Sequence, residues 1–382
     1  MSENTAIYIH IPFCVRKCPY CDFYSVTDLS IKDRFVRALE KEIILRKDGK
    51  SAIDTIYFGG GTPSLLEPLK IKAILSSIHN NFNVVDGCEI TLEVNPGTVT
   101  LGYFEEVRKS GVNRLNIGVQ SFCDKKLRFL SRIHSAKIAE KALLWARKAG
   151  FDNLGLDLIY GLPGELEKEW IKDLDRALLF HPEHLSCYML TYEPNTPMHN
   201  DLEHGLIDPL GDEAVASLFR LTSTYLAEHG YLHYEISNFA VDLDRQSRHN
   251  KKYWAQVPYL GLGPSAHSFD NRTRSWNHAD VSQYMIDLDQ GVLPVAGTEL
   301  LTGEEVLIEM VMLGLRTSYG IDINRFEEIA NHGFMEMFNS AVKDCEARSW
   351  AGIIDFRFVL TMEGRLFLDT IISMFAEKIW NR

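Results

Sequence analysis

Three of the seven cysteines lie within eight residues of one another, and they carry the clearest chemical signal in this 382-residue chain. Cys14, Cys18 and Cys21 follow the spacing Cys-x3-Cys-x2-Cys, which places three thiolates on one short loop. A structural zinc site needs four protein ligands, and no second Cys-x-x-Cys or close His pair supplies the fourth. A [4Fe–4S] cluster usually takes four cysteines, so three would leave one iron open to a ligand that is not protein. The spacing therefore favours an iron–sulfur cluster, with a zinc site or an unligated loop as the alternatives.

A second set of candidate residues stands at or just beyond the ends of the later predicted strands. The run Gly-Gly-Gly-Thr-Pro at residues 59–63 is either a tight turn before a helix or a place where a ligand approaches the backbone closely. Arg132 can hold a carboxylate through two parallel hydrogen bonds. Tyr8 and His10 alternate along the first strand and therefore share one face. Three further side chains can exchange hydrogen bonds with a ligand, although each one alone also fits a solvated strand end: Glu93, Gln120 and Asp157.

Short apolar runs alternate with helical spacing over the first 190 residues, and these elements must position the candidate groups. We predict six strands, over residues 6–12, 55–58, 89–94, 114–119, 153–159 and 185–190. Between them, Phe35, Leu39 and Ile43 share one helical face, and a second face holds Ala139, Leu143, Leu144 and Ala146. Such alternation implies a parallel sheet. Six units favour an α/β fold with a partial (β/α)6 TIM-like barrel over an open doubly wound sheet, although periodicity alone does not decide. The functional residues should lie in the loops that follow the strands.

The pattern changes after Thr191 and again near residue 301. We predict a helix over residues 212–228, a strand over residues 234–237 and a Gly/Pro-rich stretch at residues 261–264. Further on, a helix ends near residue 315 and another begins at residue 323, before a strand at residues 356–360, a turn at residues 363–364 and a last apolar helix. Helices followed by a hairpin are typical of a winged-helix-like module. We therefore divide the chain into a barrel (1–230), an accessory region (231–300) and a C-terminal module (301–382).

Composition and charge exclude several classes of protein. Apolar residues make up 46% and charged residues 24% of the chain, which is ordinary for a globular protein and unlike a disordered one. The net charge of −12 disfavours broad nucleic-acid binding. No run of about 18 apolar residues predicts a membrane span, and the first five residues lack the basic start of a signal peptide. We expect a cytoplasmic protein whose scattered cysteines are small buried side chains rather than disulfides: Cys88, Cys123, Cys187 and Cys345.

The cysteine motif, with Tyr20 before its last cysteine, resembles the signature of the radical S-adenosylmethionine (SAM) superfamily. Further segments resemble the oxygen-independent coproporphyrinogen III oxidase family, at residues 8–14, 59–64, 93–96, 118–122 and 157–164. This resemblance implies a [4Fe–4S] cluster on the three cysteines, SAM on its open iron, and an electron transfer that yields a 5′-deoxyadenosyl radical. It implies SAM contacts at eight residues: Tyr8, Gly60, Gly61, Thr62, Glu93, Gln120, Arg132 and Asp157. No residue is assigned as catalytic, because the cofactor supplies the radical chemistry.

Two branches of this family differ at positions that the sequence displays. The oxidases carry a fourth cysteine two places after the last ligand, where this chain has Phe23. They also carry a longer segment before the first strand, where only seven residues precede Tyr8. The heme chaperone branch carries His-Asn-x-x-Tyr-Trp, which is matched by His249, Tyr253 and Trp254. An imidazole can ligate heme iron and aromatic rings can stack on a porphyrin, so this polar segment, expected to be a loop, is a candidate heme site.

We therefore predict a radical-SAM-type heme chaperone that binds heme and passes it to an apo-haemoprotein. Lys251 and Lys252 would then either meet the heme propionates or form a solvated pair. The alternative is a coproporphyrinogen III dehydrogenase that uses the radical for oxidative decarboxylation, and a third class is a structural zinc protein with an interaction module. The resemblance also implies an electron donor such as flavodoxin or ferredoxin. Homodimer formation and peripheral membrane contact stay open at this point.

Overall fold

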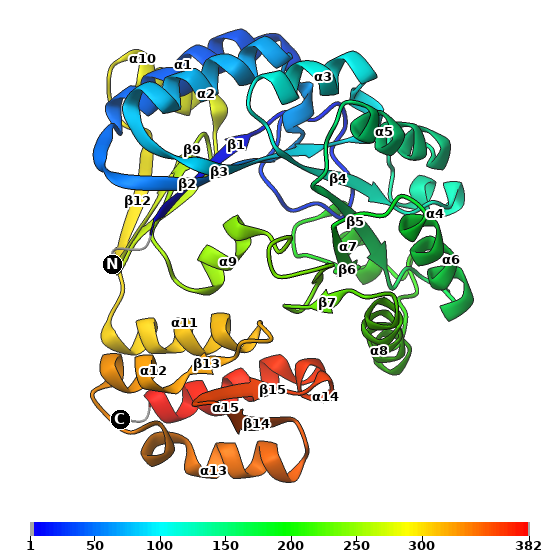
Figure 1. Ribbon diagram of the computed structural model, residues 1–382, viewed down its shortest axis with the longest axis vertical. Coiled ribbons are helices and arrows are strands. Elements are labelled where there is room, and N and C mark those ends of the chain that lie inside the picture. The colour runs from blue at the N-terminus through cyan, green and yellow to red at the C-terminus, as the bar shows by residue number, and fades with distance from the viewer. Residues whose placement is uncertain (1–3, 381–382) are drawn as a thin grey trace.

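The computed structural model describes residues 4–380 and shows a mixed α/β fold built on one large sheet (Figure 1). Over these residues the sheet has twelve strands, in the order β12-β11-β10-β9-β1-β2-β3-β4-β5-β6-β8-β7. The six predicted strands are confirmed as its parallel centre: β1 (Thr5–Ile11), β2 (Asp48–Gly60), β3 (Phe82–Val94), β4 (Arg114–Gln120), β5 (Leu154–Tyr160) and β6 (His184–Met189). Strands β2 and β3 begin earlier than expected because their first residues pair with each other.

Helices on the outer face of the parallel strands bury the main core (Figure 1). On the first helix the predicted face of Phe35, Leu39 and Ile43 is buried. On the fifth helix Leu143 is buried but Leu144 is 59% exposed, because neighbouring residues point about 100° apart around a helix. These helices are α1 (Lys32–Leu45), α2 (Pro68–Asn81), α3 (Leu101–Lys109), α4 (Asp124–Phe129), α5 (Ala136–Lys148) and α6 (Glu167–Leu178), with 3-10 turns η1 (Leu29–Ile31), η2 (Pro63–Leu65) and η3 (Pro96–Thr98).

Residues 231–300 supply strands to both edges of this sheet. Beyond β6 lie β8 (Asn238–Ala240) and β7 (Leu232–His233), which run antiparallel. The strand predicted over residues 234–237 is wrong: this segment is the connection between β7 and β8, because the buried Glu235 carboxylate accepts hydrogen bonds from Ser237 N and Asn238 Nδ2 and closes a local turn. Beside β1 the sheet continues with parallel β9 (Tyr259–Leu262), then β10 (His267–Asp270), β11 (Thr273–Asn277) and β12 (Val295–Leu300). The boundary at residue 230 stays a prediction.

Four helices connect these outer strands. The predicted helix over residues 212–228 is confirmed as α8 (Asp212–Glu228), which follows α7 (Pro197–Glu203). The helix α10 (Val281–Asp289) connects β11 to β12. The segment expected to be a polar loop is instead a short helix, α9 (Arg248–Trp254). Ser247 caps it by accepting a hydrogen bond from Asn250 N, and the Glu89 carboxylate accepts hydrogen bonds from two further backbone N–H groups at its start. These caps turn a polar sequence into a helix on the concave side of the sheet (Figure 1).

A separate hydrophobic cluster begins after residue 301 and holds the C-terminal module together. The predicted helices, hairpin and last helix are confirmed, but the turn expected at residues 363–364 lies in helix α14, which Thr361 caps. The elements are α11 (Gly303–Leu315), β13 (Ile321–Asp322), α12 (Ile323–Ala330), α13 (Phe334–Ala347), β14 (Ala351–Ile354), β15 (Arg357–Leu360), α14 (Met362–Leu366) and α15 (Leu368–Trp380). Over residues 4–380, none of the helices combines the length and apolar character that crossing a bilayer requires.

Candidate functional site

One cavity of about 1990 Å³ opens where the parallel strands end, between the sheet and the C-terminal module. The strands deliver their side chains to it because the carboxyl ends of parallel strands meet on one side of a sheet. The candidates Lys251 and Lys252 are not among the residues that line it. The fourteen residues assigned from the sequence to the cluster, SAM or heme all line it: Tyr8, Cys14, Cys18, Cys21, Gly60, Gly61, Thr62, Glu93, Gln120, Arg132, Asp157, His249, Tyr253 and Trp254. The structure therefore brings the two candidate segments, the cysteine loop and the helix α9, to a shared space.

The cysteine loop leaves β1 and is held at both ends by backbone hydrogen bonds. Cys14 N donates to Val26 O at 2.9 Å, and Cys21 N donates to Cys18 O at 3.2 Å. The three thiols are half-buried and free of disulfides. Of the scattered cysteines, Cys88, Cys187 and Cys345 are buried as expected, but the burial expected for Cys123 is wrong: its thiol is exposed, because Cys123 stands at the start of α4. Among the described residues no three His, Cys, Asp or Glu side chains converge on a single metal ion. An iron–sulfur cluster does not need such convergence, because each thiolate binds a different iron.

The glycine run packs directly against this loop. A Cβ on Gly61 would lie 2.7 Å from Phe13 O, and a Cβ on Gly60 would lie 2.7 Å from the His10 ring, so only glycine allows this approach. Gly60 also has φ +108°, a conformation that glycine adopts readily. Thr62 follows, with its Oγ1 3.6 Å from Cys14 Sγ. The run thus closes one side of the cysteine loop and exposes its backbone to the cavity.

Two carboxyl groups face the cavity from β3 and β5, the strands on either side of β4. Glu93 on β3 accepts a hydrogen bond from Tyr57 Oη at 2.8 Å, and Asp157 on β5 accepts one from Asn116 Nδ2 at 2.7 Å. Burial raises the pKa of Glu93 to about 7; the hydrogen bond from Tyr57 opposes this shift and the charge of Asp157 adds to it. Burial also raises the pKa of Asp157. A cationic ligand near these groups would relieve the cost of their ionisation.

Arg132 approaches the cysteine loop from the end of the α4 segment. Its Nη2 donates to Gly118 O at 2.9 Å and its Nη1 lies 3.6 Å from Cys18 Sγ. Within residues 4–380, its Nε and Asp157 Oδ1 are buried without a hydrogen-bond partner. A buried donor and acceptor without partners mark where a polar ligand could bind, and SAM carries both a carboxylate and hydrogen-bond donors. The three thiols therefore fit a [4Fe–4S] cluster, and the unpaired atoms of Arg132 and Asp157 fit SAM.

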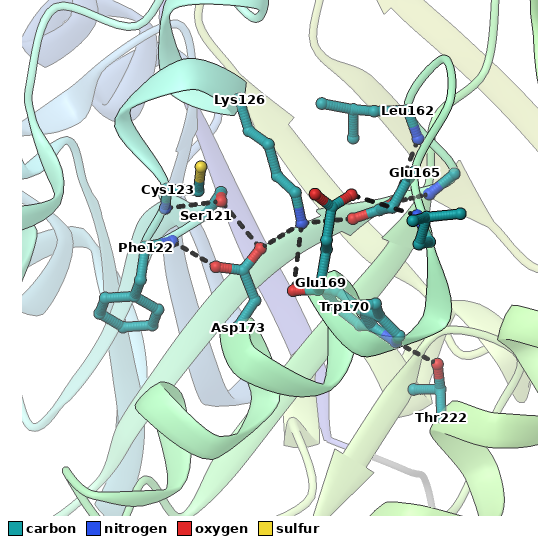
Figure 2. Close-up of polar contacts among 12 residues, drawn as sticks. Ser121, Phe122, Cys123, Lys126, Leu162, Glu165, Glu169, Trp170, Asp173 and Thr222 are labelled. Carbon is teal, nitrogen blue, oxygen red and sulfur yellow. Dashed lines mark hydrogen bonds and ion pairs between the residues drawn. The ribbon is translucent and has the colours of Figure 1, made fainter.

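A buried ion-pair network fixes the strand ends that carry these groups (Figure 2). Lys126 on α4 pairs with Glu165, and with Asp173 Oδ2 at 2.8 Å. Glu165 also accepts from Gly161 N at 2.6 Å, directly after β5, while Asp173 Oδ1 accepts from Phe122 N at 2.7 Å, just after β4. One ammonium group thus links the helix leading to Arg132 with the ends of two strands. No sequence motif indicated this cluster, because Lys126 is 39 positions from Glu165 and 47 from Asp173.

The proposed heme segment differs from its expected form. His249 is 1% exposed and both ring nitrogens are engaged: Nδ1 lies 3.0 Å from Thr55 Oγ1 and Nε2 lies 2.8 Å from Tyr253 Oη. Burial lowers the pKa of His249 to about 3, so the imidazole is neutral near pH 7. Lys252 is not part of a solvated pair, because it binds Asp54 Oδ1 at 2.9 Å. To become an axial ligand of heme iron, the His249 imidazole would therefore have to give up its hydrogen bond with Tyr253 Oη.

Two side chains near the site escaped the sequence analysis. Tyr57 and Asn116 hold the two carboxyl groups from the adjacent strands. Each alternates with apolar residues along its strand, and this period of two was the signal that could have found them.

Comparison with known proteins identifies the family to which the chain belongs. The radical SAM superfamily matches residues 8–177, and the HemN C-terminal domain matches residues 301–367. The chain is 33% identical to the heme chaperone HemW of Bacillus subtilis, over 97% of this chain and 99% of that relative. It is 37% identical to the heme chaperone HemW of Buchnera aphidicola, over 97% and 98%. It is also 31% identical to the mitochondrial radical S-adenosyl methionine domain-containing protein 1 of Danio rerio, over 97% and 86%.

The fold has a solved counterpart as well. The structure of coproporphyrinogen III oxidase (HemN) from Escherichia coli, described as a radical SAM enzyme, superposes with a TM-score of 0.85 at 24% identity. The match covers 98% of this chain and 90% of that chain, and it shows that the two share their fold. The full-length relatives show that the chain belongs to the HemW family within the radical SAM superfamily. This family is part of the oxygen-independent coproporphyrinogen III oxidase-like group, whose motifs the chain carries.

Proposed function

We propose that this protein is a radical-SAM-type heme chaperone, which binds heme and transfers it to an apo-haemoprotein. One observation carries the proposal: the cysteine loop and the His249 helix line the same cavity. Relatives named as heme chaperones match nearly the whole chain. Heme is a flat apolar ring with an iron that takes an axial donor, and the cavity offers aromatic side chains, an imidazole and thiols.

The cofactor end of the cavity would hold a [4Fe–4S] cluster through Cys14, Cys18 and Cys21. When bound, the cluster supplies an iron open to SAM and an electron for cleavage of its sulfonium bond. Arg132 would orient the SAM carboxylate, and the Glu93 and Asp157 carboxylates would accept hydrogen bonds from its ammonium or ribose groups. The remaining contacts would come from backbone and side chains that face the same space: Tyr8, Gly60, Gly61, Thr62 and Gln120.

The heme end would be formed by α9. Tyr253 and Trp254 present aromatic surface to the cavity, and His249 lies beside them. His249 Nε2 is already bonded to the Tyr253 hydroxyl, so heme binding by this imidazole would be coupled to a rearrangement of Tyr253. Heme would leave to an apo-haemoprotein acceptor, and flavodoxin or ferredoxin would be the electron donor. A cytoplasmic location belongs to the same proposal.

Parallel titration of heme into reconstituted and cluster-free protein tests the heme site. The variant His249→Ala should shift or remove the Soret band of bound heme while the cluster absorbance and SAM affinity stay intact. Tyr231→Phe is a matched control, because this buried tyrosine binds Pro182 O and does not line the cavity. A His249→Ala protein that binds heme with an unaltered spectrum and affinity would remove His249 as axial ligand.

A second assay separates the chaperone from the oxidase alternative. Phe23 is 66% exposed and occupies the place where the resemblance puts an extra cysteine in the oxidases. We expect no conversion of coproporphyrinogen III during anaerobic incubation with SAM and a reductant, as followed by chromatography of the porphyrins. Decarboxylation over many turnovers would contradict the chaperone assignment.

A further inference from the structure

Four arginines from the second half of the chain line the cavity, and they fall into two pairs with different surroundings. Arg220 binds Glu363 through two hydrogen bonds of 2.7 and 2.9 Å. Arg274 binds Glu309 through two contacts of 2.8 and 3.0 Å. These two guanidinium groups are each neutralised by a carboxylate of their own.

The other pair, Arg316 and Arg365, lacks such neutralisation. In both side chains Nε is buried and has no hydrogen-bond partner among residues 4–380. Arg365 Nη1 reaches only His233 O at 3.5 Å, and Arg316 Nη2 lies 4.0 Å from Glu235 Oε2. Both guanidinium groups thus lie against β7 and its connection to β8, and both line the cavity.

Glu235 is the single carboxylate that these two cations share. Its side chain is buried, and Oε1 already accepts hydrogen bonds from Ser237 N and Asn238 Nδ2. Its charge acts on both guanidinium groups. Two cations facing one carboxylate leave one positive charge in excess. The cost of burying that charge falls mainly on Arg365, because the Arg316 side chain is 36% exposed to solvent. Burial accordingly lowers the pKa of Arg365 despite the nearby Glu235. The pair is therefore poised to accept an anionic group from the cavity.

Arg316 lies against α9, the helix that forms the proposed heme segment. The guanidinium of Arg316 stacks over the Trp254 ring at 4.8 Å from its centre, and Trp254 is the last residue of the helix that carries His249. Phe367 adds apolar surface beside Arg365 and stacks on Trp350 at 4.3 Å. A planar ligand lying along α9 would thus bring its far edge to Arg316, which shares the charge of Glu235 with Arg365.

We propose that Arg316 and Arg365 form the carboxylate-binding end of the heme site, where they hold the propionate side chains of the bound macrocycle. This inference rests on the proposed heme-chaperone function and names the residues that orient the ligand within it. Guanidinium groups suit the task because they bind carboxylates through paired hydrogen bonds. The proposal assigns the C-terminal module a direct part in ligand recognition, since Arg365 lies on α14 and Arg316 follows α11.

Titration of heme and heme dimethyl ester into the full-length protein, followed by Soret absorbance, tests this assignment. Wild-type protein should bind heme about ten-fold more tightly than the ester, whose carboxylates are blocked. Arg316→Gln and Arg365→Gln should each weaken heme binding by about ten-fold and leave ester binding unchanged. The control Arg220→Gln, which loses a guanidinium already paired with Glu363, should keep the wild-type preference. Reconstituted cluster absorbance reports on folding, and the more exposed Arg316 decides the test should Arg365→Gln fail to fold.

The outcomes separate this inference from the function on which it rests. Variants that keep the full preference for heme over its ester would overturn the carboxylate site and leave the heme-chaperone proposal standing. A wild-type protein that binds neither compound would overturn both. Restoration of the preference by Arg316→Lys, which keeps the positive charge, would support the site.

Discussion

The raised pKa of Glu93 predicts that SAM affinity depends on pH through this one carboxyl. The groups around it are Tyr57, which donates a hydrogen bond at 2.8 Å, the charges of Asp157 and Arg114, and the backbone N–H of Gly60. With a pKa of about 7, the free protein holds a proton on Glu93 below neutral pH. A cationic ligand favours the carboxylate, so binding must release that proton, and affinity should rise as pH rises.

The size of this pH effect on SAM affinity follows from the pKa shift of Glu93. If bound SAM returns the pKa of Glu93 from about 7 to its ordinary 4.5, the affinity at about pH 6 should be roughly ten-fold lower than at about pH 8. The amino group of SAM titrates in a similar range, near 7.7–8.0 for a typical α-amino group, and contributes a slope of its own. The informative quantity is therefore the difference between wild type and Glu93→Gln, which keeps an acceptor for the Tyr57 hydroxyl but has no proton to release.

Titration calorimetry on reconstituted protein, repeated in buffers of different ionisation enthalpy, measures both affinity and proton release. We expect wild type to release about one more proton than Glu93→Gln near pH 6. Tyr231→Phe, at a buried tyrosine that does not line the cavity, is the control. Equal pH slopes for wild type and Glu93→Gln would refute the reasoning and remove Glu93 from the SAM site.

Three further predictions concern the cluster, the buried ion pairs and acid stability. Replacing the three cysteines of the loop with serine should abolish the visible absorbance of the reconstituted cluster, whereas Cys123→Ser, at an exposed thiol, should keep it. Lys126→Met leaves two buried carboxylates without their cation and should lower the free energy of unfolding by about 3–5 kcal/mol in urea titrations, while Lys109→Met, in an exposed pair, should change it little. Burial lowers the pKa of His233 and His249 to about 3, so the folded state favours their neutral forms. Their stabilising contribution is present above the unfolded pKa of about 6.5 and is lost below it, by about 1.4 kcal/mol per histidine at pH 5.5. Matched unfolding curves at pH 7.5 and 5.5 for wild type and His233→Gln check this, because the comparison cancels the contributions of the other titrating groups. An equal loss of stability in both proteins would contradict the prediction for His233.

Local sequence pattern was sufficient for most of the elements that position the site. Strands such as β1 and β5 were predictable because apolar residues repeat with a fixed period, and α8 was predicted at its observed bounds. The cysteine loop was readable for a similar reason, since its ligands lie within a few residues of one another. Capping was the local signal that the prediction missed at α9, where Ser247 begins a helix in a polar segment.

Only the tertiary structure decided which charged side chains, distant in sequence, form ion pairs. Lys126 meets Glu165 and Asp173 because α4 and α6 pack together beside the strand ends (Figure 2), and no repeat in the sequence records that packing. The same holds for the guanidinium groups of the C-terminal module, which face the cavity only because α11 and α14 lie against the β7–β8 connection. The amino-acid sequence alone therefore determined which polar and charged side chains each helix, strand and loop carries. Which of those groups stay unpaired, and so free to bind a ligand, depends on burial and neighbours that exist only after folding.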